Sequence, residues 1–135
     1  MKKYLAAAAA VIFLTGCGQS AENDMQYIKT SVMYDTLTDM YQNPEQYLGK
    51  LYHMSGQFYP SESDDGTKIY SVYTEGSDGH GIGLELDWSD YSGLNERDMI
   101  TVEGKLDKEE FEHDGEKSEF LILRVTSLEK RDKSE

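Results

Sequence analysis

Three histidines could in principle hold a metal ion, and two of them lie near carboxylates in the sequence. His80 follows Asp78 by two residues in a glycine-rich stretch, and His113 lies in a strongly acidic stretch. His53 falls in a stretch of alternating apolar residues. None of them has a histidine or cysteine at the short spacing of a local zinc motif. We therefore expect no bound metal. One alternative hypothesis is that the protein handles metal ions through His80, Asp78 and His113.

Two carboxylates, Glu85 and Asp87, alternate onto one face of an expected strand. Two such groups could act as an acid/base pair if they lay close together in a cleft. Neighbouring carboxylates on an exposed strand are much more often plain surface, so a hydrolase is the least favoured alternative. The sequence also lacks a Gly-x-Ser-x-Gly motif for a serine nucleophile. We therefore expect no catalytic residue, no cofactor and no enzymatic activity.

Cys17 is the single cysteine, so neither an intrachain disulfide nor a cysteine-based zinc site can form. It follows a basic start, an apolar run from Leu5 to Leu14, and the small residues Thr15 and Gly16. The apolar run is shorter than the roughly 20 residues that span a bilayer. Its place at the N-terminus is typical of an export signal.

The segment Leu14-Thr15-Gly16-Cys17 resembles the lipobox of bacterial lipoproteins. In that family the cysteine sulfur receives a diacylglyceryl group and the leader is cut just before it. The resemblance implies that residues 1–16 are a signal peptide and that Cys17 becomes a lipidated N-terminus, with palmitate among its acyl chains. Two or more acyl chains anchor a protein stably. The implied location is the cell membrane, facing the outside or the periplasm; a plain secretory signal is the alternative.

The chain has 135 residues and a formal net charge of −13. A surface this acidic repels phosphate backbones, so we expect no nucleic-acid partner. It suits cations or basic partners. Ten tyrosines and one tryptophan are many for this length, and serve either as packing or as a binding face.

Alternation of apolar and polar residues predicts strands, because successive side chains of a strand point to opposite faces. The expected strands cover about residues 50–59, 68–74, 82–88, 98–106 and 118–128. Gly56 and Gly104 interrupt the first and fourth of these, which predicts a bulge or sharp bend in each. Ahead of the strands, Met33, Leu37 and Met40 recur at helical spacing and predict a helix that packs on one end of the strands.

Three strands, a short connector and two further strands resemble the OB-fold, a five-stranded Greek-key barrel. The residues that carry the resemblance are Tyr47-x-Gly49-Lys50, continuing to Phe58, and Ile100-x-Val102-x-Gly104-x-Leu106. They are similar to anticodon-binding-like OB domains of bacterial lipoproteins. The stretch 44–50 also resembles the OB domain that ends a family of membrane permease subunits. That family carries a paired cysteine after the second strand, which residues 71–74 lack.

We therefore expect a mainly β protein, in which an N-terminal α-helix precedes an OB-fold-like barrel. Residues 17–30 are polar and predict a flexible tether, 31–131 the folded domain, and 132–135 a solvated tail.

The OB resemblance implies a ligand site on the second and third strands, flanked by loops 61–67 and 107–117. The residues mapped onto it are Tyr70, Tyr73, Glu85, Asp87 and Trp88. The sequence does not fix which strand faces point to solvent. Tyrosines and carboxylates together suit a basic peptide or a sugar. We therefore expect a lipid-anchored binding or interaction module of the cell envelope, whose ligand is another envelope protein or a small molecule.

Overall fold

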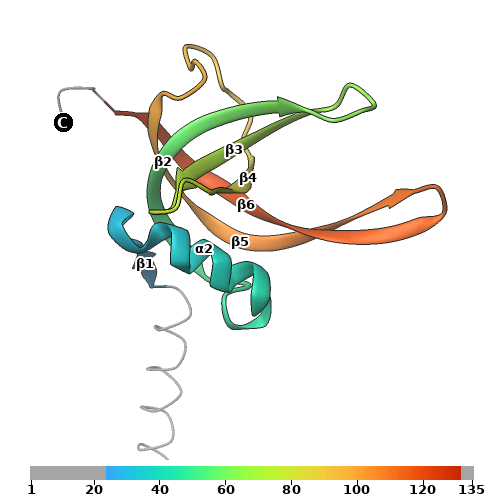
Figure 1. The fold of residues 1–135 in the computed structure, drawn as a ribbon, viewed down its shortest axis with the longest axis horizontal. Coiled ribbons are helices and arrows are strands. Elements are labelled where there is room, and N and C mark those ends of the chain that lie inside the picture. Colours follow the sequence, from blue (N-terminus) through green and yellow to red (C-terminus); the bar gives the residue numbers. More distant parts are fainter. Residues whose placement is uncertain (1–23, 132–135) are drawn as a thin grey trace, which may run out of the picture.

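The computed structural model describes residues 24–131, apart from the side chain of His113 (Figure 1). The predicted signal peptide, Cys17, the first part of the tether and the tail at 132–135 lie outside the described residues.

Five strands close into a barrel, as the sequence predicted (Figure 1). The strands are β2 (Leu51–Glu62), β3 (Lys68–Glu75), β4 (Gly81–Asp87), β5 (Met99–His113) and β6 (Glu116–Lys130). Their order around the barrel is β2-β3-β4-β6-β5, and pairing of β2 with β5 closes it. The β4–β6 pair is parallel and the other pairs of the barrel are antiparallel. This is the expected OB-fold-like Greek-key barrel, and the prediction of a mainly β fold is confirmed.

Gly104 lies at an irregularity of the β5–β6 pair, which confirms the bulge predicted there, and Gly56 lies where β2 changes its partner strand. β2 pairs with β5 up to Gln57 and with β3 from Gln57 onward, so the strand changes partner next to Gly56. A Cβ on Gly56 would lie 2.7 Å from the Tyr73 carbonyl oxygen. Gly104 follows a register shift in the β5–β6 pair, and its Cβ would lie 2.4 Å from the Arg124 carbonyl oxygen. Only glycine permits these approaches.

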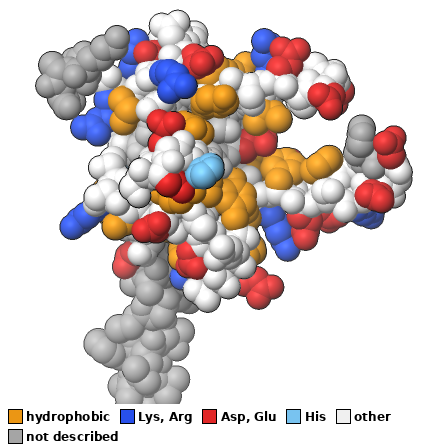
Figure 2. Space-filling view, in the orientation of Figure 1, with side chains coloured by type: hydrophobic (Ala, Val, Ile, Leu, Met, Phe, Trp, Pro, Cys, Tyr) orange, Lys and Arg blue, Asp and Glu red, His pale blue; other side chains and the backbone are white. Residues whose placement is uncertain are grey.

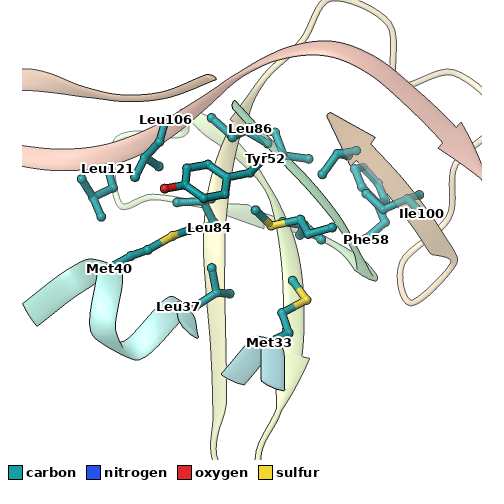
Figure 3. Close-up of a cluster of buried hydrophobic side chains, with 14 residues drawn as sticks. Met33, Leu37, Met40, Tyr52, Phe58, Leu84, Leu86, Ile100, Leu106 and Leu121 are labelled. Atoms are coloured by element: carbon teal, nitrogen blue, oxygen red, sulfur yellow. The ribbon is translucent and has the colours of Figure 1, made fainter. Parts of the chain in front are cut away.

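Helix α2 (Met33–Gln42) closes one end of the barrel, as the helical spacing predicted. It lies between two short 3-10 turns, η1 (Thr30–Val32) and η2 (Pro44–Gln46). Met33, Leu37 and Met40 are fully buried. Figure 3 shows these three side chains pointing from the helix toward the strands. Their neighbours in the core are inward-facing strand residues: Tyr52, Met54, Phe58, Val72, Leu84, Leu86, Ile100, Val102, Leu106, Leu121 and Leu123.

A short additional strand, β1 (Met25–Tyr27), pairs in parallel with Leu51–His53 of β2. It falls within the segment that the sequence suggested as a flexible tether, so the described end of that segment belongs to the sheet. β3 pairs with β2 only from Gln57 onward, which leaves one edge of the first half of β2 open for β1. The Tyr27 ring also packs on the His53 ring, with centroids 4.7 Å apart.

Two hairpins extend from the barrel (Figure 1). The β2–β3 hairpin is paired out to Glu62 and Lys68, and the β5–β6 hairpin out to His113 and Glu116. Asp114 and Gly115 form the turn of the second hairpin, both with positive φ (53° and 81°), as the Asp-Gly pair predicts. The two hairpins border a groove on the outer face of the barrel.

Candidate ligand-binding groove

The outer face of β2 and β3 carries the side chains that point away from the core. Tyr59 lies opposite Ser71, and Ser61 lies opposite Ile69, so these four share one face. Tyr73 follows Ser71 by two residues and joins them, because strand side chains alternate. Phe58 and Val72 point the other way and are buried in the core.

β4, β6 and α2 complete a groove of about 320 Å³ on this face. Its lining consists of Tyr41, Tyr59, Ser61, Ile69, Ser71, Tyr73, Gly83, Glu85, Phe120 and Leu121. Figure 2 shows the notch between the two hairpins, with hydrophobic side chains where the β5–β6 hairpin leaves the barrel and acidic side chains at the hairpin tips. The groove therefore combines an aromatic lining with an acidic surround.

Three tyrosines shape the groove. The rings of Tyr59 and Tyr73 stack with centroids 4.9 Å apart. The Tyr73 ring lies over Gly81, since a Cβ there would fall 1.7 Å from the Tyr73 hydroxyl oxygen. Tyr41, near the end of α2, donates a 2.6 Å hydrogen bond to the Gly83 carbonyl oxygen. Gly81 thus makes room for the Tyr73 ring, and the Gly83 carbonyl oxygen accepts the hydrogen bond that holds Tyr41 in the groove wall.

Glu85 is the only carboxylate in the lining of the groove within residues 24–131. Its side chain is half-buried, and burial raises its pKa, with further contributions from Glu109 and Asp87. Burial and then the charge of Glu85 raise the pKa of Tyr41 in turn. Among the described residues, no hydrogen bond or ion pair joins Glu85 to another side chain. Glu85 is therefore a half-buried carboxylate that has no cationic partner within residues 24–131.

Arg124 pairs with the acidic side chains near Glu85 and not with Glu85 itself. Its guanidinium lies 3.1 Å from carboxylate oxygens of Asp87, Asp107 and Glu109. Glu85 is therefore left beside a cluster in which one cation already serves three carboxylates.

The structure brings together two of the five residues mapped from the OB resemblance, Tyr73 and Glu85. Tyr70 lies on the opposite face of β3, where its ring stacks on Phe58 (5.8 Å) and Tyr91 (4.1 Å) at the edge of the core. Asp87 shares the outer face with Glu85 but is held by Arg124. Trp88 follows the end of β4, is half-exposed and lies outside the groove lining.

Sequence reasoning did not single out Tyr41, Tyr59, Ile69 and Phe120 as site residues. Tyr59 and Ile69 carried a signal, because their alternation places them on the face that Tyr73 shares. Tyr41 and Phe120 reach the groove from a helix and a strand far away in the sequence, and no local pattern indicates that contact.

His53 and His80 lie apart from the groove lining. His80 Nδ1 lies 2.9 Å from Asp78 Oδ2 in the exposed β3–β4 turn. His53 Nδ1 lies 2.7 Å from Glu103 Oε2 beneath Tyr27. Within the described part of the chain, no group of three or more histidine, cysteine or acidic side chains is arranged to hold a metal ion. His80 and Asp78 supply two ligands at most.

A second hollow, of about 470 Å³, is lined by Gln26, Gln46, Tyr47, Lys50 and Tyr52. It is larger than the groove, but Lys50 is the one charged group among its described lining residues, and that amine can extend into solvent. The groove between the hairpins offers stacked rings and a half-buried carboxylate, so we regard it as the better candidate site. Among residues 24–131, no helix has both the length and the apolar character needed to cross a bilayer.

Two solved structures that resemble the chain are single-stranded DNA-binding proteins. One is the small protein from Streptomyces coelicolor, at 11% identity, and the other is the mitochondrial Rim1 from S. cerevisiae, at 15%. Each comparison has a TM-score of 0.40 and covers 60% of this chain and 93% of the other. No curated protein matches the chain. Residues 16–135 match the DUF1980 C-terminal domain, and the chain therefore belongs to that family.

Proposed function

We propose that the protein is a non-catalytic binding module of the cell envelope, held on the membrane through a lipidated Cys17. The groove is the observation that carries the binding role. The barrel presents stacked tyrosine rings next to a half-buried carboxylate that has no partner among the described residues, an arrangement that costs stability unless a ligand uses it.

The chemistry of the groove supports binding more than catalysis. Among the described residues, Glu85 has no second free carboxylate beside it, because Arg124 engages Asp87 and Glu109. The other polar side chains of the lining are serine and tyrosine hydroxyls, and no histidine with a described side chain lies among them to activate one. The net charge of −13 argues against a nucleic-acid ligand.

The membrane role rests on the sequence Leu14-Thr15-Gly16-Cys17. Cys17→Ser removes the thiol that would be acylated, so the full-length chain should leave the membrane fraction and lose metabolic labelling with a palmitate analogue. Ser20→Ala, three residues further along, is the matched control and should keep both. A Cys17→Ser protein that stays tightly membrane-bound would contradict the anchor.

The binding role is tested by a thermal-shift screen of the full chain in a mild detergent, against short peptides, oligosaccharides and divalent metals. A ligand of the groove should raise the melting temperature of the wild type and not of Tyr73→Ala. Tyr27→Ala, which removes an exposed ring outside the groove, should respond as the wild type does. A metal-specific shift abolished by His80→Ala or His113→Ala would point instead to metal handling.

A further inference from the structure

We infer that the ligand of the groove is a basic peptide segment, which places one lysine or arginine side chain over the Tyr59–Tyr73 pair with its charged end at Glu85. This inference rests on the proposed function and names the chemistry of the partner. It is carried by the charge, the aromatic surface and the open backbone of the groove.

The half-buried carboxylate of Glu85 favours a cationic ligand in the groove. Glu85 is half-buried, and no cationic side chain within residues 24–131 pairs with it. Asp87 and Glu109 lie close enough to disfavour its ionisation. Arg124 already contacts both of these and Asp107. An ammonium or guanidinium group at Glu85 would provide the missing countercharge in a partly desolvated place, where a charge-assisted hydrogen bond is strong.

The aromatic surface suits the same group. A lysine or arginine head is attracted to the face of a tyrosine ring. Tyr59 and Tyr73 are already stacked on one another, so neither ring needs to be ordered on binding. Ile69 and Phe120 supply apolar surface in the same groove, against which the aliphatic stem of a lysine or arginine can pack.

The backbone next to the groove is open to an extended chain. β4 pairs with β3 only from Ser71 to Glu75, so the Lys68–Tyr70 segment has no strand on its β4 side among the described residues. An added peptide strand commonly binds such an unpaired edge. This feature favours a peptide over a free amine or a sugar, because a peptide can use the edge and the side-chain site together.

The test measures binding of a labelled nine-residue peptide, in which lysine alternates with threonine, to the full chain in mild detergent. Binding is measured by fluorescence anisotropy at about 150 mM salt, which screens long-range attraction between the peptide and exposed acidic groups of the protein. Glu85→Gln should weaken binding about tenfold, the loss expected for one charge-assisted hydrogen bond. Tyr59→Leu, which keeps apolar volume and removes the ring face, should weaken it about two- to fivefold.

Two controls separate the groove from the overall acidity of the protein. Glu45→Gln makes the same charge change at an exposed position on η2 and should alter the affinity less than about twofold. A peptide with norleucine in place of lysine keeps the stem without the charge and should bind at least about tenfold more weakly.

Several results would overturn the inference. Equal losses in Glu85→Gln and Glu45→Gln would mean that the peptide binds the acidic surface in general. Equal binding of the norleucine peptide would mean that no cation is recognised. If an oligosaccharide binds the groove and the lysine peptide does not, the basic-peptide inference fails while the binding function stands. If no ligand class distinguishes Tyr73→Ala from the wild type, the proposed function fails as well.

Discussion

The hydroxyl of Tyr41 donates a 2.6 Å hydrogen bond to the carbonyl oxygen of Gly83, which joins α2 to the middle of β4. β4 pairs with β6 only from Glu85 onward, so the edge of β4 near Gly83 lies beyond the β4–β6 ladder. The helix thereby satisfies a carbonyl group that the sheet leaves open, and its tyrosine becomes part of the groove wall.

We predict that Tyr41→Phe lowers the free energy of unfolding by about 0.5–1 kcal/mol, because one hydrogen bond is lost at a half-exposed site where water can partly replace it. Urea denaturation measures the change. Tyr34→Phe is the control, since no described residue forms a hydrogen bond with its hydroxyl and its ring packs on Gly76. Equal effects of the two variants would show that the Tyr41 bond contributes nothing.

The close contacts at the barrel glycines predict that Gly→Ala substitutions lower the free energy of unfolding by graded amounts. Gly104→Ala and Gly56→Ala place a Cβ 2.4 Å and 2.7 Å from backbone oxygens, so each should cost about 2 kcal/mol or more. Gly83→Ala places its Cβ no closer than 3.4 Å to a neighbour and should cost less than about 1 kcal/mol. Thermal unfolding would rank the three, and a Gly83→Ala loss as large as the others would contradict the steric account.

The role of α2 in closing the barrel predicts that Leu37→Ala is strongly destabilising. Leu37 is fully buried between the helix and the strands, and removing such a side chain costs about 2–5 kcal/mol. Asp35→Ala on the exposed side of the same helix should change stability by less than about 0.5 kcal/mol. Similar denaturation midpoints for the two variants would mean that the helix does not seal the core.

Glu85 should destabilise the folded protein at neutral pH when no ligand is bound. Because burial raises its pKa in the folded protein, the folded state binds the proton more tightly than the unfolded state does, and stability falls as pH rises through that pKa. Glu85→Gln should therefore melt about 1–2 °C higher than the wild type at pH 7, a small change since the group is partly exposed. The difference should shrink near pH 4, where the carboxyl is protonated. A Glu85→Gln protein that melts lower at pH 7 would contradict this cost.

The contribution of Asp39 to the stability of the fold should have the opposite dependence on pH. A hydrogen bond from the Tyr47 hydroxyl, and a second from Asn43, lower the pKa of Asp39. A carboxylate with a lowered pKa stabilises the fold above its unfolded-state pKa, and this contribution is lost as pH falls through the folded-state pKa. Tyr47→Phe should move the Asp39 pKa up toward 3.8 in an NMR titration of the side-chain carboxyl carbon. An unchanged titration curve would mean that the bond does not act on Asp39.

Local alternation predicted the barrel strands well where one face is apolar, as in β2 and β4. It ended the fourth strand near residue 106, whereas β5 continues to His113. The added residues are mostly charged on both faces of the strand. Apolar and polar residues therefore do not alternate there, and the sequence gives no sign that the strand continues. β1 was missed for a related reason: its three residues are ordered by a distant strand, not by their own pattern.

The candidate site was predicted in part for similar reasons. Tyrosines occur on both faces of β3, so the sequence could not distinguish Tyr70, which packs at the edge of the core, from Tyr73, which lines the groove. Glu85 was identified through alternation. That it has no cationic partner among the described residues could not be predicted, because Arg124 reaches Asp87, Asp107 and Glu109 from another strand.

The pairing of β2 with β5 also has a consequence for how the chain folds. The β5–β6 hairpin turns through two residues and can form within about 1–10 μs, as local hairpins do. The β2–β5 seam joins residues such as His53 and Glu103, which are 50 positions apart, so its formation must first overcome the entropy of closing a long loop. Proteins with many such distant pairings fold in about milliseconds to seconds. We therefore expect the hairpin to assemble early and the seam to close last, as the rate-limiting event of folding.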